Sequence, residues 1–191
     1  MIKLKTPISE EEIRKLKIGD SVLLSGVIVT GRDEAHKLMI EEKPGFIREP
    51  LKESVIYHCG PVVKQDSDGT WSFVSAGPTT SMREEPYQAD VVCEYNIRGV
   101  IGKGGMGPKT AEGLKKCGAV YFHAVGGAGT LIANAVKKVH TVHKLEEFGT
   151  PEAFWVIEVE DFPLVVTMDS HGGSIHQEIK EKSQKIADEI M

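Results

Sequence analysis

The chain has 191 residues, of which 40% are hydrophobic and 27% are charged, and its formal net charge is −5. This composition is typical of a soluble globular protein, and a chain of this length can bury a core without disulfides or a structural metal. The acidic balance argues against a nucleic-acid partner, because neutralising phosphates needs an excess of lysine and arginine. The first residues show no signal segment and no apolar run can span a bilayer, so we expect a cytoplasmic protein without a membrane partner.

The three cysteines, Cys59, Cys93 and Cys117, are widely spaced. An odd number argues against a disulfide framework, and the lack of a C-x-x-C pair argues against a self-contained iron–sulfur site. We therefore expect three free thiols. The 7 histidines show no metal-ligand pattern either, so no metal site is expected on this chain.

Strand signals dominate the first half of the chain. The apolar, β-branched run Ser21–Thr30 predicts a strand, and Ser9 with Glu12 predicts a capping box at a helix start. In chain order we expect a helix from Ser9 to Leu16 that stops near Gly19, a strand at Ser21–Thr30, a helix over Glu34–Ile40 capped by Asp33, and strands at Ser54–Tyr57 and Trp71–Ser75 around a turn at 65–69.

The second half alternates between strands and helices, which predicts a mixed α/β domain. The tail from Ser174 places four isoleucines at near-helical spacing on an otherwise charged helix. Before it we expect helices at Tyr87–Tyr95, Thr110–Lys116 (ending at Gly118) and Gly129–Val136, and strands at Gly99–Ile101, Ala119–Val125, Phe154–Val159 and Leu164–Met168.

Four glycine-containing loops follow predicted strands and precede predicted helices. Such junctions bind anionic ligands in α/β proteins, because a helix N-terminus presents free N–H groups. In the first loop, Arg32 is a candidate to hold a carboxylate through its forked donors. The alternative is a surface ion pair with Asp33 or Glu34, since exposed arginines are mostly solvated.

The second loop, Gly77–Arg83, combines three hydroxyls with an arginine. Hydroxyls donate hydrogen bonds and Arg83 carries a fixed positive charge, which suits an anionic substrate. The alternative is helix capping by Thr80 or Ser81, although a single cap does not need three hydroxyls.

The third loop, Gly102–Gly107, matches the pattern G-x-G-x-x-G. No acidic ribose partner follows at the end of the next strand, and Pro108 stands where a phosphate-binding loop requires lysine. Nucleotide binding is therefore disfavoured, but Lys103 remains flanked by glycines that let its backbone approach a ligand. The fourth loop, Gly126–Gly129, suits either an anion site or close helix packing.

Together these motifs resemble the β subunit, or C-terminal domain, of the iron–sulfur hydro-lyases called class I fumarases, and that of the related L(+)-tartrate dehydratases. The matching segments occur in the family's order between about Leu16 and Asp169. They are Leu24–Gly26, Thr30–Lys37, Gly60–Pro61, Gly77–Arg83, Ile101–Met106 and Glu158–Pro163. The resemblance implies an α/β fold of the swivelling β/β/α type, with a mixed sheet and helices, over residues 1–170, followed by a helical tail at 171–191.

The resemblance also implies roles for individual loop residues. The catalytic base proposed for the family corresponds to Thr79. The substrate-binding residues correspond to Arg32, Thr80, Arg83 and Lys103. Family members often carry Met-Asp after the arginine of the second loop, where this chain has Glu84 and Glu85.

A partner is implied as well, because the family's cluster-binding cysteines belong to the α subunit. We therefore expect a [4Fe-4S] cluster on a separate α chain, an α2β2 assembly, and a dicarboxylate substrate. The expected reaction is the reversible hydration of fumarate to L-malate, with L(+)-tartrate dehydration as the alternative. Two alternatives from other classes are a stand-alone anion- or nucleotide-binding module built on Gly102–Gly107 and a purely structural subunit.

Overall fold

The computed structural model describes residues 1–190 and contains strands and helices in alternation after an N-terminal strand. The strands are β1 (Ile2–Lys5), β2 (Ser21–Thr30), β3 (Val55–Tyr57), β4 (Val62–Gln65), β5 (Trp71–Ser75), β6 (Gly99–Gly102), β7 (Val120–His123), β8 (Val136–His143) and β9 (Phe154–Met168). The helices are α1 (Glu10–Ile13), α2 (Asp33–Glu41), α3 (Arg48–Leu51), α4 (Glu85–Glu94), α5 (Pro108–Cys117), α6 (Gly129–Ala133), α7 (Leu145–Phe148) and α8 (Ile175–Ile190), with 3₁₀ turns η1 (Gly45–Ile47) and η2 (Ser81–Glu84).

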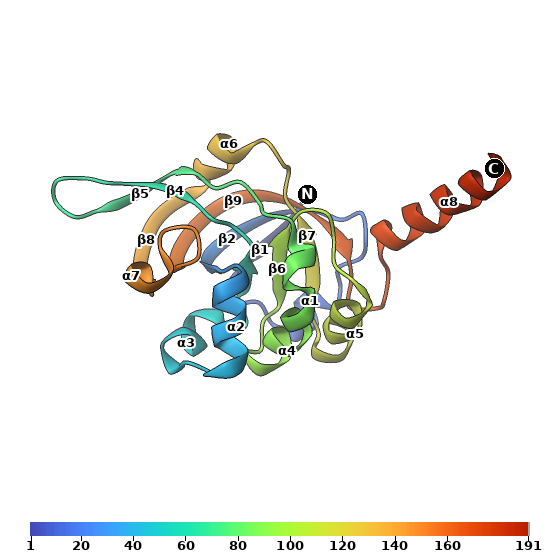
Figure 1. The fold of residues 1–191 in the computed structure, drawn as a ribbon, viewed down its shortest axis with the longest axis horizontal. Coiled ribbons are helices and arrows are strands. Elements are labelled where there is room, and N and C mark those ends of the chain that lie inside the picture. The colour runs from blue at the N-terminus through green and yellow to red at the C-terminus, as the bar shows by residue number, and fades with distance from the viewer. Residues whose placement is uncertain (191) are drawn as a thin grey trace.

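The main sheet is mixed, as the sequence predicted. Strands β1, β2, β3, β6 and β7 run parallel to one another, and β9 is antiparallel to β2, β7 and β8. Because β9 pairs with both β2 and β7, the strands β2, β3, β6, β7 and β9 form a closed cycle of pairings. The hairpin of β4 and β5 is a separate sheet that extends away from the body (Figure 1).

Alternate residues of the strands face two different hydrophobic cores, as the pleat of a strand requires. In β7, Val120 and Phe122 belong to one core and Tyr121 to the other. The first core also includes residues of β2, β3, β6 and β9. The second core packs the sheet against the helices, through residues such as Met39 of α2 and Val92 of α4.

Helices α4 and α5 pack closely because Gly113 has no side chain where they meet. A Cβ on Gly113 would lie 2.8 Å from Cα and Cβ of Ala89. A disulfide between Cys93 and Cys117 joins the same two helices, with the Cα atoms 5.5 Å apart. The expectation of three free thiols is therefore wrong for this pair, which is created by helix packing, and Cys59 is the free, buried cysteine among residues 1–190.

Local signals near the N-terminus are confirmed. The strand at Ser21–Thr30 has the predicted bounds, and Ser9 and Glu12 form a reciprocal capping box. The cap predicted for Asp33 is wrong, because Arg32 occupies the N-cap position of α2 without a side-chain cap bond and Asp33 is the first helical residue.

Two predictions in the second half need correction. The helix expected at 129–136 ends at Ala133, and Val136 instead begins β8, which pairs with β9. The two strands expected on either side of Pro163 are one continuous strand, because Pro163 lies within the antiparallel pairing with β2. In both places the pairing with a distant strand decides the local structure.

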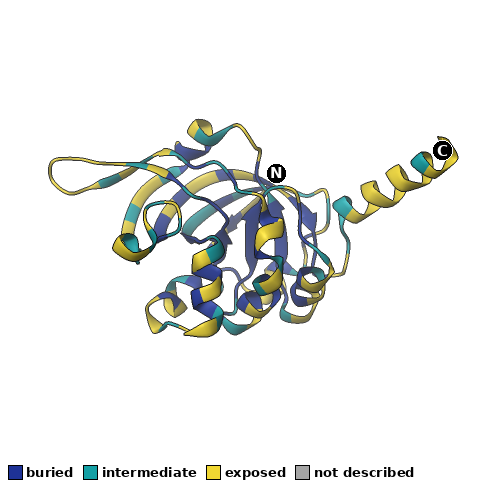
Figure 2. Cartoon of the chain, in the orientation of Figure 1, coloured by how far each residue is buried: buried dark blue, intermediate teal, exposed yellow. Residues whose placement is uncertain are grey.

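The C-terminal helix α8 projects from the body, and Figure 2 shows its surface as mostly exposed. The sequence predicted this helix, and none of its residues is buried. The boundary at residue 170 between domain and tail stays a prediction. Across residues 1–190, no helix has both the length and the apolar character that crossing a membrane requires.

Candidate active site

The candidate site lies where the parallel strands β2, β3 and β6 end. Just after β2, Gly31 donates its N–H to the carbonyl of Tyr57 at 3.0 Å, and just after β3, His58 donates to the carbonyl of Ile101 at 2.8 Å. The loops that follow these strands, which carry Arg32 and Lys103, therefore leave the same edge of the sheet. This carboxyl edge is where open α/β sheets bind ligands.

The loop Gly77–Arg83 is held at this edge by three backbone hydrogen bonds. Thr79 donates its N–H to the carbonyl of His58 at 2.7 Å, and Lys103 donates its N–H to the carbonyl of Thr79 at 3.2 Å. Ser81 donates in turn to the carbonyl of Lys103 at 3.1 Å. The backbone thus places Thr79 and the exposed Thr80 directly beside Lys103, and Thr80 forms a parallel β-bridge with Lys103.

The side chain of Lys103 is half-buried and has no carboxylate within ion-pair distance among the described residues. It lies against the fourth glycine loop, because a Cβ on Gly126 would be 3.6 Å from Cδ of Lys103. Farther along the same loop, Gly129 packs on Gly77, because a Cβ on Gly129 would lie 3.2 Å from the backbone nitrogen of Gly77. The packing role considered for this loop is confirmed, and the ammonium group of Lys103 is left unpaired within residues 1–190.

Arg32 lies over Gly60 and pairs with Glu152. A Cβ on Gly60 would be only 2.6 Å from Nη1 of Arg32, so a glycine leaves room for the guanidinium group. Nε of Arg32 lies 3.3 Å from Oε1 of Glu152, and the other carboxylate oxygen of Glu152, Oε2, accepts the backbone N–H of Glu34. The surface pair with Asp33 or Glu34 that the sequence allowed does not form.

Arg83 makes its ion pair with Asp33, from the first turn of α2. The Arg83 side chain is 59% exposed, whereas that of Asp33 is 30% exposed. Asp33 therefore anchors one edge of the guanidinium group and leaves the rest facing outward. Thr80 occupies the N-cap position of η2 but makes no side-chain cap bond, so the capping explanation for this loop is wrong for Thr80.

A buried hydrogen-bonded network lies beneath this loop. Nδ1 of His58 is 2.8 Å from Oγ of Ser81, which is 2.8 Å from the hydroxyl of Tyr121. The other ring nitrogen of His58 is 2.7 Å from the side-chain amide of Gln88. All four side chains are buried, so the network fixes Ser81, and with it the adjacent Thr80, relative to β3 and β7.

The network continues from Gln88 to His36, 3.0 Å away. Nδ1 of His36 is 2.8 Å from the carbonyl oxygen of Arg32, an acceptor, so this nitrogen carries the ring proton. Burial lowers the pKa of His36 and lowers that of His58 well below its ordinary value, so both rings are neutral at pH 7. The Gln88 amide can then donate to both rings if its nitrogen faces them, which also pairs a nitrogen that otherwise lacks a partner.

Glu84 is a fully buried acid next to the substrate-binding candidates. Neither of its carboxyl oxygens has a hydrogen-bond partner among the described residues, and Oε2 lies 3.9 Å from Nδ1 of His58. Burial, followed by the neighbouring Asp33 carboxyl group, raises the pKa of Glu84 to about 8. Glu84 therefore keeps its proton at neutral pH and is a hydrogen-bond donor.

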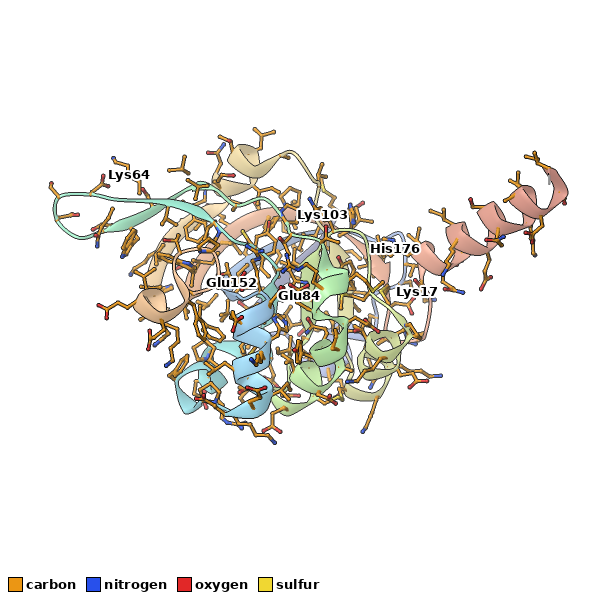
Figure 3. All side chains as sticks on the ribbon, in the orientation of Figure 1. Lys17, Lys64, Glu84, Lys103, Glu152 and His176 are labelled. Carbon is orange, nitrogen blue, oxygen red and sulfur yellow. A yellow bond between two sulfur atoms is a disulfide. The ribbon has the colours of Figure 1, made fainter. Side chains whose placement is uncertain are left out.

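The candidate residues gather in one region of the molecule. In Figure 3 the side chains of Glu84, Glu152 and Lys103 lie around the beginnings of α2 and α4. Burial raises the pKa of Glu152, and the charges of Arg32 and Arg83 both oppose that shift, so both guanidinium groups are within electrostatic reach of one carboxylate. The residues that the sequence singled out are thus neighbours, and their roles are proposals.

Sequence reasoning missed the buried layer under these residues, which consists of His36, His58, Ser81, Glu84, Gln88 and Tyr121. The histidines show no metal-ligand spacing, and the network is created by contacts among α2, η2, α4, β7 and the segment just after β3. The signal that was present is the pair of glutamates at 84 and 85 directly after Arg83, where one acid is buried.

This chain's described residues do not form a metal centre. No three His, Cys, Asp or Glu side chains gather as metal ligands within residues 1–190. Cys93 and Cys117 form a disulfide, so neither offers a thiolate. Burial raises the pKa of the Cys59 thiol to about 12, which disfavours the thiolate that binds iron. The donor set on this chain does not fit an iron–sulfur cluster.

The fold and the site define a class of protein, namely a mixed α/β domain that gathers cations and hydroxyls at the carboxyl edge of its sheet. Residues 1–179 match the family model described as Fumarase C-terminus, and the chain belongs to this family.

Three relatives show how the family is arranged. The chain is 50% identical over 183 residues to "Putative fumarate hydratase class I" of Geobacillus stearothermophilus, covering 96% of this chain and 35% of that protein. It is 43% identical over 187 residues to "Putative L(+)-tartrate dehydratase subunit beta" of Methanocaldococcus jannaschii, covering 96% of this chain and 95% of that protein. It is 39% identical over 192 residues to "L(+)-tartrate dehydratase subunit beta" of Escherichia coli K12, covering 98% and 94%. Both enzyme names are those of hydro-lyases.

Proposed function

We propose that this chain is the β subunit of a two-subunit hydro-lyase that interconverts fumarate and L-malate. The observation that carries the proposal is the gathering of Arg32, Arg83 and Lys103 beside the Thr79–Thr80 loop at the carboxyl edge of the sheet. Family membership and the hydro-lyase names of the relatives support it.

The chemistry needs fixed positive charge at the substrate. Removing a proton from the carbon next to a carboxylate builds further negative charge on that carboxylate. Fixed cations stabilise this charge more in the transition state than in the ground state. We assign the binding of the two substrate carboxylates to Arg32, Arg83 and Lys103, with the exposed hydroxyl of Thr80 as an additional donor.

Thr79 is the proposed base, and the proton from the substrate carbon goes to its Oγ. A hydroxyl is a poor base in water, so it needs neighbouring cations that favour its alkoxide or a path that passes the proton on. We assign this role to Lys103, since its backbone is hydrogen-bonded to that of Thr79. The buried network under the loop holds this geometry.

The partner completes the site in this proposal. Because this chain's residues do not fit a cluster, we assign the [4Fe-4S] cluster to an α subunit, in a cytoplasmic α2β2 assembly. When bound, the open iron supplies a Lewis acid for the departing hydroxide. The 35% coverage of the Geobacillus protein fits this division, because that longer chain has room for both parts.

L(+)-tartrate dehydration is the second candidate. Two separate β subunits named for that activity match this chain over 95% and 94% of their own lengths. Tartrate has one hydroxyl more than malate, and the same cations would bind its two carboxylates. The choice between the substrates is therefore left to experiment.

The test is to co-express the chain with its candidate α subunit, purify the complex anaerobically, and measure turnover of L-malate and L(+)-tartrate. We expect activity only in the complex and a loss of at least about 100-fold in Thr79→Ala and Arg83→Ala. Matched controls are Thr70→Ala, in the exposed turn of the hairpin, and Arg48→Ala, whose ion pair with Glu94 lies elsewhere.

The possible outcomes separate the hypotheses. Turnover of tartrate alone would keep the mechanism and change the substrate. Full activity in both site variants would reduce this chain to a structural subunit. Failure of the two chains to associate would contradict the divided site and favour an anion-binding module.

A further inference from the structure

Two carboxyl groups, those of Glu84 and Asp33, are neighbours beside the substrate-binding arginines, because Asp33 contributes to the raised pKa of Glu84. Glu84 is fully buried at the end of η2, and Oδ1 of Asp33 is also buried without a hydrogen-bond partner in the described chain. The other oxygen of Asp33 binds Arg83. Two adjacent carboxylates cannot both ionise without strong repulsion, so one of them keeps a proton.

The surroundings decide which group keeps the proton. Asp33 at the start of α2 and Arg32 just before it are close to Glu84. Nδ1 of His58, just after β3, lies 3.9 Å from Oε2 of Glu84. Tyr121 of β7 is near enough for the Glu84 charge to influence its titration, and its own pKa is raised by burial. Since Asp33 already has a cationic partner in Arg83 and Glu84 has none in direct contact, the proton belongs on Glu84.

We propose that Glu84, as a neutral acid, is a positioning residue that sets how firmly Asp33 holds Arg83 and how much positive charge the two arginines present to a dicarboxylate. With its proton, Glu84 is neutral and the pair carries one negative charge. Without it, the pair carries two negative charges behind Arg32 and Arg83. The inference rests on the proposed function, because the affected ligand is the substrate dicarboxylate.

The consequence is a pH-dependent KM. An additional buried negative charge draws the Arg83 guanidinium inward and weakens the attraction of both arginines for the substrate. The chemical step uses other groups, so kcat changes much less than KM. A purely structural role for Glu84 would not produce this split.

The first measurement is made on the full chain alone. Isotope-edited infrared spectra with ¹³C-labelled glutamate report a protonated carboxyl group directly. We expect such a band at pH 7, with a titration midpoint near pH 8. The band should be absent in Glu84→Gln and retained in Glu49→Gln, an exposed control on α3.

The second measurement is the pH profile of the complex with the α subunit. Between pH 7 and pH 9 we expect the wild-type KM for malate or tartrate to rise roughly tenfold, with kcat changing less than about twofold. Glu84→Gln should hold KM nearly constant over this range. Asp33→Asn, a second variant that removes the partner carboxylate, should lower the infrared midpoint and also flatten the profile.

Each result has a defined meaning. Absence of the protonated band, or an unchanged KM slope in Glu84→Gln, overturns the proposal. A complex inactive on both dicarboxylates overturns the proposed function and this role with it. The band then shows whether the acid pair itself exists, which distinguishes the two failures.

Discussion

Lys103 donates its backbone N–H to the carbonyl of Thr79 at 3.2 Å, so the proposed base and a substrate-binding cation are held by the backbone itself. Loops are usually the more mobile parts of a fold. Here Ser81 donates its N–H to the carbonyl of Lys103, and the residue before Lys103, Gly102, lies directly against the Ser81 side chain of the buried network. The geometry of the site should therefore be sensitive to changes that lie under the loop and touch no substrate.

Replacing Gly102 by alanine tests this sensitivity. A Cβ at this position would lie 1.8 Å from Oγ of Ser81 and 2.9 Å from the Tyr121 hydroxyl, so Ser81 must move. We expect Gly102→Ala to reduce turnover by the complex at least about tenfold and to destabilise the chain by about 1–3 kcal/mol, the usual range for overpacking. Turnover assays and urea denaturation measure the two effects.

The control for that change is Gly45→Ala. A Cβ on Gly45 meets nothing within 4 Å, and its backbone is not in the left-handed region. We expect no more than about 0.5 kcal/mol of destabilisation there and unchanged turnover. Equal effects of the two alanines would show that the ladder around Gly102 does not position the site.

The sequence predicts well what short-range interactions determine. Ser21–Thr30 forms the predicted strand because its β-branched residues are buried, and Gly118 ends α5 in the left-handed conformation that glycine readily adopts. The same local reasoning placed Arg32 and Lys103 in loops that follow a strand and precede a helix. Their distances and partners required the fold.

The sequence predicts poorly what distant residues determine. Asp33 is well suited to cap a helix, but in the fold its carboxylate binds Arg83, 50 residues away. Val136 begins a strand because β9 pairs with it, and Cys93 meets Cys117 because α4 packs on α5. The buried acid Glu84 belongs to the same category, since exposure at that position depends on α2.

Glu84 should make the chain less stable as pH rises from about 5 to 8. Its pKa in the folded chain is about 8, above the ordinary value of 4.5, so between these values the folded state binds more protons than the unfolded state. Stability from this group is fully present below pH 4.5 and is lost as pH rises through 8. The contribution of Glu84 to stability should fall by up to about 4 kcal/mol over this interval, since one unit of pKa corresponds to 1.36 kcal/mol.

Urea denaturation at closely spaced pH values measures this loss. Glu84→Gln removes the titrating group, so the stability of wild type relative to Glu84→Gln should fall by that amount between pH 5 and pH 8, whereas the pH profile of Glu49→Gln should parallel that of wild type. Parallel pH profiles for Glu84→Gln and wild type would mean that Glu84 is ionised in the folded chain.

The neutral histidines should limit stability on the acidic side. Burial lowers the pKa of both His36 and His58, so below pH 6.5 the unfolded state binds more protons than the folded state. The contribution of the two histidines to stability should therefore fall as pH decreases from about 6.5, opposite in sign to the effect of Glu84. In His58→Gln, which keeps hydrogen-bonding groups but cannot become an imidazolium, the acidic loss should be smaller.

Denaturation between pH 7 and pH 4.5 tests the histidine prediction, with the exposed His140→Gln on β8 as the matched control. Proton NMR of the ring signals adds a direct reading, because His36 and His58 should both still be neutral at pH 6.5. If both buried rings are already protonated at pH 6.5, the hydrogen-bond assignment through Gln88 is incorrect.

The disulfide between Cys93 and Cys117 should make stability depend on reductant. It closes a loop with a sequence separation of 24 between α4 and α5. In the chain-entropy model a loop of this size contributes about 3 kcal/mol by restricting the unfolded chain. We expect urea midpoints to fall when a reductant is added to the wild type, and Cys93→Ser to show the lower midpoint with or without reductant. Cys59→Ser, which removes the free thiol, should keep the reductant dependence, whereas a wild type indifferent to reductant would show that the two sulfurs are not bonded in solution.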